Sequence, residues 1–303
     1  MYAAISIEFP NLGIKIYDLG KSFSVFGFEV AYYGIIIALG IIAGIVVALL
    51  EAKRTGQSIE DYLDFAIYAI IFSIIGARAY YVIFNWDYYS ENPGQIINIR
   101  GGGLGIYGAI IAAIVTCFVY TRIKKMSFRK IADTGCLGLI TGQIIGRWGN
   151  FFNREAYGTV CSDSNPFAMR LYFDSEFSIS RVTDEIAEAM REMSGSTVSS
   201  LGYIQVHPTF LYEMLWNLLV LILILIFRDH KKYDGEVMLW YLAGYGLGRF
   251  FIEGIRSDQL LLGGLDIPVS QLLSLLLFVG CGGFVIIKRI MIAKKKGGMK
   301  ALV

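Results

Sequence analysis

The run of residues 146–158, GRWGNFFNREAYG, places ionisable and amide side chains at the end of a long apolar stretch. Ionisable side chains at membrane depth are costly and usually functional. Arg147 keeps its proton in any protein environment, so an anion should lie against it, either Glu155 or a bound ligand. Arg249 and Glu253 end another apolar stretch in the same way. Two arginine faces directed at one point would make a clamp for a phosphate group.

The composition is that of a protein with many membrane helices. The chain has 303 residues, of which 55% are hydrophobic and 17% are charged, and its mean hydropathy is +0.57. These values lie outside the usual range for a soluble domain. The net charge of +2 gives no indication of nucleic-acid binding. The first thirty residues lack the basic start and apolar core of a cleaved signal peptide, so we expect the first membrane helix to direct insertion.

Apolar runs of roughly 20 residues, the length that crosses a hydrocarbon core, predict an all-α membrane protein with about seven membrane helices. The predicted limits of the spans are 30–50, 62–84, 103–121, 132–152, 208–227, 236–254 and 268–287. Short cytoplasmic loops hold an excess of Lys and Arg. The loops after spans one, three, five and seven are basic, whereas Arg100 and Arg256 are the only basic residues between spans two and three and between spans six and seven. The N-terminus is therefore predicted outside the cell and the C-terminus inside.

The segments between the spans complete the expected organisation. The predicted parts are an extracytoplasmic N-terminal segment at 1–29, helices 1–4 within 30–152, an extracytoplasmic cap at 153–207, helices 5–7 within 208–287 and a basic cytoplasmic tail at 288–303. A loop as long as the cap is more often a functional lid or a disordered segment than a neutral connector.

On this topology nearly all polar residues of the spans lie at the outer ends of the helices. They are Arg78, Tyr107, Arg147, Asn150, His207, Arg249 and Glu253. Arg147 and Asn150 are three residues apart and share one helix face. Structural explanations exist, because Arg78 can reach the headgroups, Asn150 can bond another helix and Arg249 can pair with Glu253. Three arginines from different helices on one side of the membrane favour a functional site.

Several kinds of chemistry have no matching motif in the sequence. The chain has two histidines, His207 and His230, and it lacks HExxH and paired CxxC motifs, which argues against a zinc site. The residues before Lys21 and Ser22 lack the first glycine of a phosphate loop, and no GxSxG motif is present. We expect neither a metal nor an organic cofactor.

With these residues assembled, the chain resembles the prolipoprotein diacylglyceryl transferase family, bacterial membrane enzymes that begin lipoprotein maturation. The likeness extends from about Tyr32 to Arg256. It rests on five motifs in the family's order: AYYG at 31–34, IIGARAYYVIF at 74–84, GRWGNFFNREAYG at 146–158, HPTFLYE at 207–213 and GYGLGRFFIEGIR at 244–256. The family has seven membrane helices and an outside N-terminus, which agrees with the arrangement predicted from charge.

The resemblance implies that the diacylglyceryl group of phosphatidylglycerol is transferred to the lipobox cysteine thiol of a preprolipoprotein signal peptide, giving a thioether and glycerol phosphate. It also implies a multi-pass protein of the bacterial plasma membrane with its site toward the outer leaflet. Arg147 and Arg249 match positions that the family uses for catalysis. The predicted lipid-binding residues are Arg147, Asn150, Glu155, Gly158, Tyr33, Tyr245 and Glu253, together with Arg78 and His207.

The chain departs from the family at Tyr107, where many members carry a histidine that is proposed as the base. A tyrosine with a pKa near 10 accepts a thiol proton poorly at neutral pH. Either Tyr107 positions the lipid, or neighbouring arginines ionise it, or His207 or Glu155 takes the proton.

The alternative function is an anionic-lipid or organic-anion transporter, whose arginines would bind headgroups without making bonds. Transport needs a polar path to the inner side of the membrane. The inner halves of the spans hold few ionisable residues apart from Asp64 and Asp133. That scarcity favours the enzyme.

Overall fold

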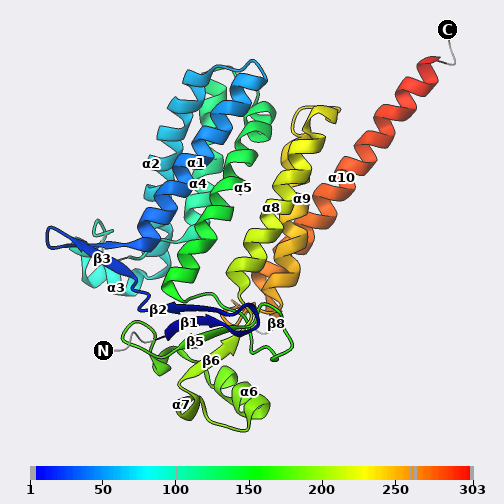
Figure 1. Ribbon diagram of the computed structural model, residues 1–303. Coiled ribbons are helices and arrows are strands. Elements are labelled where there is room, and N and C mark those ends of the chain that lie inside the picture. The colour runs from blue at the N-terminus through cyan, green and yellow to red at the C-terminus, as the bar shows by residue number, and fades with distance from the viewer. Residues whose placement is uncertain (1–4, 100–101, 260, 263–264, 301–303) are drawn as a thin grey trace. The chain divides into compact units, whose positions relative to one another are not determined.

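The computed structural model describes residues 5–99, 102–259, 261–262 and 265–300. Within these ranges seven helices have 18 residues or more, and each overlaps one predicted span. They are α1 (Tyr32–Arg54), α2 (Ile59–Phe84), α4 (Ile106–Ile123), α5 (Phe128–Asn153), α8 (Thr209–Phe227), α9 (Glu236–Glu253) and α10 (Val269–Lys300) (Figure 1). Arg100 and the last three residues of the predicted tail lie outside the described residues.

Five of these helices, α1, α2, α4, α8 and α10, are long and apolar enough to cross a membrane. Their most apolar windows have mean hydropathies between 1.8 and 2.8. The other two, α5 and α9, carry the polar motifs at 146–158 and 244–256. The described chain is therefore a mainly helical membrane protein. Helix α10 continues through residues 288–300 of the predicted basic tail.

The chain divides into two compact units, which we describe separately. The second unit, residues 45–138 and 233–238, contains α2 and α4. These two helices meet at Gly76 and Gly108, and a Cβ added at Gly76 would lie 2.7 Å from the Gly108 carbonyl oxygen. Small residues allow such close approach of two backbones in lipid. Helix α2 begins at a cap, where the Ser58 side chain accepts a hydrogen bond from the backbone N–H of Asp61.

The first unit, residues 1–44, 139–232 and 239–303, contains an antiparallel sheet. Its strands lie in the order β2 (Ile14–Tyr17), β1 (Ile5–Phe9), β5 (Met169–Tyr172) and β6 (Tyr203–Val206) (Figure 1). Leu171 is the register partner of Ile7 on one side and of Ile204 on the other, and all three side chains are fully buried. The predicted N-terminal segment and cap are therefore one folded layer, and the expected all-α class omits this sheet.

Two short helices complete this layer, α6 (Asp184–Ser194) and α7 (Val198–Leu201). Ile186 and Met190 of α6 pack into the same hydrophobic core as the strands. The remaining short elements are the hairpins β3 (Ser22–Val25) with β4 (Phe28–Ala31) and β7 (Leu261–Leu262) with β8 (Leu265–Pro268), the helix α3 (Trp86–Glu91), and the 3₁₀ turns Pro10–Leu12, Pro93–Gln95, Ile179–Arg181 and Arg228–His230.

A buried ion pair joins the end of α5 to this layer. The Arg154 side chain is fully buried, and its Nη1 lies 2.6 Å from Oδ1 and 2.7 Å from Oδ2 of Asp174. Arg154 also donates to the Leu19 carbonyl oxygen. Burial alone raises the pKa of the Asp174 carboxyl, but the hydrogen bonds from Arg154 and two backbone N–H groups outweigh it, so the pKa is lowered. The first turn beyond α5 is thereby fixed in position.

Candidate functional site

Three arginines of the first unit surround one buried carboxylate. Glu213 of α8 is 4% exposed, and its Oε1 accepts hydrogen bonds from Arg249 Nη1 at 2.7 Å and Arg256 Nη1 at 3.4 Å. Its Oε2 lies 2.5 Å from Nη2 of Arg147. Glu253 pairs with Arg249 four residues earlier on α9. We call these five residues the arginine cluster.

Close packing of α8 on α9 fixes the geometry of the arginine cluster. The Trp216 indole donates a hydrogen bond to the Gly244 carbonyl oxygen at 2.8 Å. A Cβ added at Gly248 would overlap the Trp216 ring, so only glycine fits there. Trp216 lies three residues after Glu213, and Gly248 directly precedes Arg249. The glycines of the motif at 244–256 therefore let the two charged faces meet.

The charges in the cluster do not balance in its buried part. Three guanidiniums face the carboxylates of Glu213 and Glu253, which are 4% and 2% exposed. The third carboxylate nearby, Asp258, pairs with Arg256 at 2.8 Å and its side chain is 51% exposed, so water screens it. The cluster therefore holds one more positive charge than its two buried carboxylates balance. A singly charged phosphodiester matches this excess.

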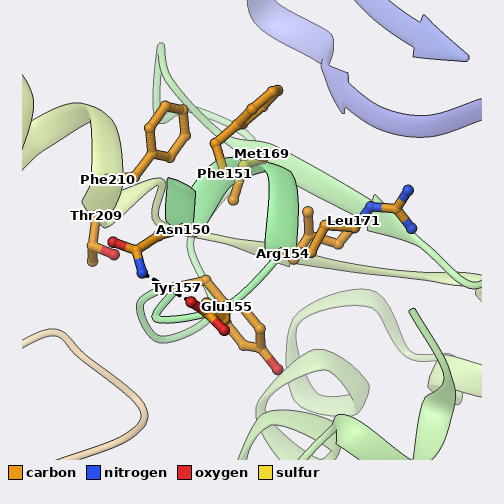
Figure 2. A pocket seen from close by; sticks show the side chains of 9 residues that line it. All are labelled: Asn150, Phe151, Arg154, Glu155, Tyr157, Met169, Leu171, Thr209 and Phe210. Carbon is orange, nitrogen blue, oxygen red and sulfur yellow. Dashed lines mark hydrogen bonds between the residues drawn. The ribbon is translucent and has the colours of Figure 1, made fainter. Parts of the chain in front are cut away.

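Asn150 and Glu155, both predicted site residues, lie together at the end of α5, the helix that carries Arg147. The Asn150 side-chain amide donates a hydrogen bond to Glu155 Oε1 at 3.2 Å, and both line a small pocket (Figure 2). Arg154 lines the same pocket, but Figure 2 shows its guanidinium directed away from them. Arg154 and Ala156, the residues on either side of Glu155, have φ values of 50° and 55°. Positive φ at two non-glycine residues is costly, and such strain is concentrated at functional sites.

Gly158 joins three segments of the first unit. Its N–H donates to the His207 carbonyl oxygen at 2.9 Å, and it forms a backbone bridge with Arg256. A Cβ at this position would lie 2.8 Å from the His207 Cβ and from the Ile255 carbonyl oxygen. Any side chain here would push apart the end of α9 and the start of α8, and so would displace Arg256.

The His207 ring is hydrogen-bonded to one residue of the cap and to one residue of α8. Its Nδ1 lies 3.0 Å from Nδ2 of Asn165 and 3.2 Å from the Tyr212 hydroxyl. Burial lowers the pKa of His207. The neutral ring is therefore favoured at pH 7, with Nδ1 accepting from the Asn165 amide.

The two predicted tyrosines of the first unit also have defined neighbours. Tyr33 packs against α5 at Gly149, where an added Cβ would lie 2.7 Å from the ring. Gly149 lies between Arg147 and Asn150 in the sequence. Tyr245 stacks on Tyr241 with ring centroids 6.0 Å apart, and it precedes Arg249 by one helical turn.

The other two predicted site residues, Arg78 and Tyr107, belong to the second unit. Arg78 donates hydrogen bonds to four backbone carbonyl oxygens, those of Gln95, Ile96, Gly102 and Gly103, at 2.6 to 2.9 Å. Four of its five N–H donors are thus used within the unit. The ring of Tyr107, at the start of α4, lies 6.2 Å from that of Tyr80. The contacts of Arg78 favour a structural role over the predicted headgroup contact.

Glu213 was not predicted as a site residue from the sequence, and Arg256 was counted only as a loop charge. Both lie in motifs that carry the family resemblance. Glu213 is the last residue of HPTFLYE, and Arg256 is the last residue of GYGLGRFFIEGIR. A carboxylate one turn inside an apolar helix was the available signal. Within the described residues, no three His, Cys, Asp or Glu side chains are grouped as a metal site would require.

Comparison with known proteins assigns the family. The family model described as "Prolipoprotein diacylglyceryl transferase" matches residues 21–287. A curated relative from Finegoldia magna, named phosphatidylglycerol--prolipoprotein diacylglyceryl transferase, is 43% identical over 259 residues, which cover 85% of this chain and 91% of the relative. Relatives of the same name from Clostridioides difficile and Lysinibacillus sphaericus are 41% and 44% identical, covering 86% and 90% of this chain and 91% and 92% of their own lengths. The chain therefore belongs to the prolipoprotein diacylglyceryl transferase family and is a transferase of lipoprotein biosynthesis.

Proposed function

We propose that this protein transfers the diacylglyceryl group of phosphatidylglycerol to the thiol of a lipobox cysteine in a preprolipoprotein. The observation that carries the proposal is the arginine cluster, in which three guanidiniums face two buried carboxylates. Phosphatidylglycerol brings one negative charge on its phosphodiester. The names of the relatives supply the donor lipid and the class of acceptor.

In the proposed reaction the cysteine sulfur attacks the glyceryl carbon that bears the phosphate ester. A C–S bond forms while the C–O bond to phosphate breaks, and the electron pair leaves with glycerol phosphate. The sulfur must first lose its proton, because the thiolate is the nucleophile and a free cysteine has a pKa near 8.5. The phosphate oxygen gains charge in the transition state, and positioned arginines stabilise that charge.

Arg147 and Arg249 are the proposed phosphate ligands. Each already holds one oxygen of Glu213, so their forks are oriented before the lipid arrives. Such preorganisation lowers the cost of reaching the transition state. Glu253 fixes the second nitrogen of Arg249. The residues proposed to contact the glycerol headgroup are Asn150, Glu155, Tyr33 and Tyr245. Gly158 allows the start of α8 and the end of α9 to lie close together.

The candidates for the general base are His207, Glu155 and Tyr107. His207 is the weakest candidate, because Asn165 and Tyr212 occupy its Nδ1. Glu155 accepts a hydrogen bond from Asn150 and retains free acceptor capacity. We propose that Tyr107 orients the headgroup by hydrogen bonding and that Glu155 receives the thiol proton.

We propose seven membrane helices with the N-terminus outside, so that the site faces the outer leaflet of the bacterial plasma membrane. The basic loops after α1 and α4 support this orientation. Reporters fused near Ser180 should lie outside, and reporters near Lys125 or after Lys295 should lie inside. Labelling of position 125 by an impermeant reagent from outside would contradict the orientation.

The decisive experiment incubates the purified protein with phosphatidylglycerol and a lipobox peptide and looks for the adduct by mass spectrometry. The expected product is the peptide enlarged by one diacylglyceryl group, with glycerol phosphate released in equal amount. A peptide with serine in place of the cysteine is the matched control, and it should stay unmodified. If the folded protein binds the lipid but forms no adduct, the transferase proposal fails and the transporter alternative gains support.

A further inference from the structure

A second polar layer lies one helical turn away from the arginine cluster, on the side toward the middle of the helices. Gln143 precedes Arg147 on α5 by four residues, and Asn217 follows Glu213 on α8 by four residues. Residues four apart share one helix face. We call Gln143 and Asn217 the amide layer.

Two contacts between α5 and α8 define a register, and its extension predicts that the two amides lie on facing levels of the helices. Phe151 contacts Phe210 with ring centroids 5.0 Å apart, and Arg147 contacts Glu213 one turn further along. The two helices are therefore antiparallel, and the next matched pair is Gln143 with Asn217. Asn217 follows Phe210 by seven residues, so both lie on the face of α8 that is directed at α5.

Both members of the amide layer have a buried polar atom without a hydrogen-bond partner. Asn217 is 2% exposed, and its Nδ2 makes no hydrogen bond. The Oε1 of Gln143 is also buried and without a partner. A buried donor or acceptor left unpaired costs free energy, and native proteins hold few of them. The next positions along the register, Ile140 and Val220, are apolar and buried, so the amide layer is the last polar level of this face.

The chemistry of the missing partner follows from the position of the layer. In a diacylglycerol phospholipid the two ester carbonyls follow the phosphate by the length of the glycerol backbone, toward the acyl chains. One helical turn rises about 5.4 Å, so a phosphate held at the arginine cluster would place these carbonyls at the level of the amide layer. An ester carbonyl oxygen only accepts hydrogen bonds, and the Asn217 Nδ2 only donates them.

We propose that Asn217 donates a hydrogen bond to an acyl-ester carbonyl of the bound lipid and that Gln143 orients this contact from α5. The inference rests on the proposed function, because it requires the phosphate to lie at the arginine cluster. It adds a second recognition level: the arginine cluster binds any anionic phospholipid headgroup, whereas the amide layer selects lipids whose chains are ester-linked. A site built to hydrogen-bond one group rejects an analogue that lacks it.

The test compares two donor lipids that differ only at this group, diester phosphatidylglycerol and its dialkyl ether analogue. For the wild-type protein we expect kcat/KM to be about tenfold lower with the ether lipid, the scale of one lost hydrogen bond. For Asn217→Leu we expect kcat/KM with the diester lipid to fall to the value measured with the ether lipid. The kcat/KM with the ether lipid should stay unchanged. Gln143→Leu should reduce the preference in the same direction.

Ser274→Ala is the matched control, because Ser274 is another buried polar residue of a long helix. It is 3% exposed, but its hydroxyl donates to the Ser270 carbonyl oxygen of its own helix at 2.6 Å. This variant should keep the wild-type preference for the diester lipid. Asn217→Leu should also unfold at or above the wild-type temperature, since the amide it removes has no partner in the free protein.

Two outcomes overturn the proposal: a wild-type protein that uses both lipids equally, or an Asn217→Leu variant that keeps the full preference. If Asn217→Leu does not accumulate, Asn217→Ser, which keeps a donor on a shorter side chain, must retain part of the preference. Lipid affinity measured without peptide separates this proposal from the proposed function. Selective binding of the diester lipid without adduct would support the amide layer and refute the transfer.

Discussion

Arg78 and Arg147 both end apolar helices, but they are satisfied in different ways. Arg78 donates to four backbone carbonyl oxygens, which are neutral and fixed by the chain itself. Arg147 contacts one carboxylate, Glu213, which it shares with Arg249 and Arg256. A carbonyl cradle consumes the donors of a guanidinium, whereas a shared carboxylate leaves donors that a second anion can take.

The contrast shows that the partners of an arginine at membrane depth indicate whether its role is structural or functional. The Arg78 cradle fixes the loop before α4, including Gly102 and Gly103 at positive φ, where glycine is favoured. The guanidiniums of the arginine cluster are paired with carboxylate side chains, from residues of α5, α8 and the end of α9. Substitutions at the two places should therefore damage different properties, stability for Arg78 and turnover for Arg147.

The largest effect is expected for Arg147→Lys. Lysine keeps the charge but loses the planar fork that grips two oxygens. Transfer should fall by more than about 100-fold, because the lost interaction acts on the charge that forms in the transition state. Membrane insertion and amount should match the wild type, and Arg181→Lys on the exposed cap should keep full activity. Near-normal turnover of Arg147→Lys would show that Arg147 supplies only bulk charge.

Glu213→Gln sharpens the comparison by removing the shared anion without changing its shape. Arg147 and Arg249 should lose their common orientation, so kcat should fall by about 10- to 100-fold, the scale of one or two charged hydrogen bonds. The KM for phosphatidylglycerol should stay level or fall, because the cluster gains net positive charge. Glu29→Gln, on the exposed hairpin, controls for charge. A rise in KM at unchanged kcat would assign Glu213 to lipid binding instead.

Tyr107→Phe should lower turnover by about tenfold to thirtyfold. That fall corresponds to roughly 1.4–2 kcal/mol, the scale of one hydrogen bond to a charged group. Tyr107→His should keep activity and extend it toward lower pH, because an unperturbed histidine has a pKa near 6.5. Turnover of both variants across pH gives the answer. Complete loss in Tyr107→Phe with intact lipid affinity would identify Tyr107 as the proton acceptor.

The smallest effect on activity is expected for Arg78→Lys. Lysine cannot reach four carbonyl oxygens at once, so buried acceptors lose their donors and the protein should unfold at a temperature lower by roughly 5 °C. The kcat/KM of the folded fraction should stay within about threefold of wild type. A tenfold rise in the KM for phosphatidylglycerol with unchanged stability would instead support the headgroup contact predicted from the sequence.

The helices were predictable because their apolar runs are continuous in the sequence. The predicted span at 208–227 and the observed α8, Thr209–Phe227, agree at both ends. Hydropathy also located Arg147 and Arg249, since a charge in an apolar run is conspicuous. The partner of a charge was harder to predict. Nothing in the sequence states that Glu213 turns toward Arg147 or that Arg78 turns toward carbonyls, because backbone acceptors have no side-chain signature.

The sheet was missed for a different physical reason. β1 has five residues and β5 has four. Each becomes part of a stable sheet only when the other strand pairs with it. Short apolar runs do not separate strand from loop by themselves. The pairing of Ile7 with Leu171 is a property of the folded chain, and no local window contains both.

That pairing has a consequence for how the protein is made. Glu8 of β1 and Tyr172 of β5 are hydrogen-bonded partners 164 residues apart. At ribosomal rates of about 5–20 residues per second, β1 emerges roughly 10–30 s before its neighbour exists. During that interval β1 has only the hairpin with β2, and its other edge has no partner. Completion of the sheet is therefore a late event in biogenesis, because β5 and β6 follow α5 in the chain and β1 cannot gain its second neighbour before they are synthesised.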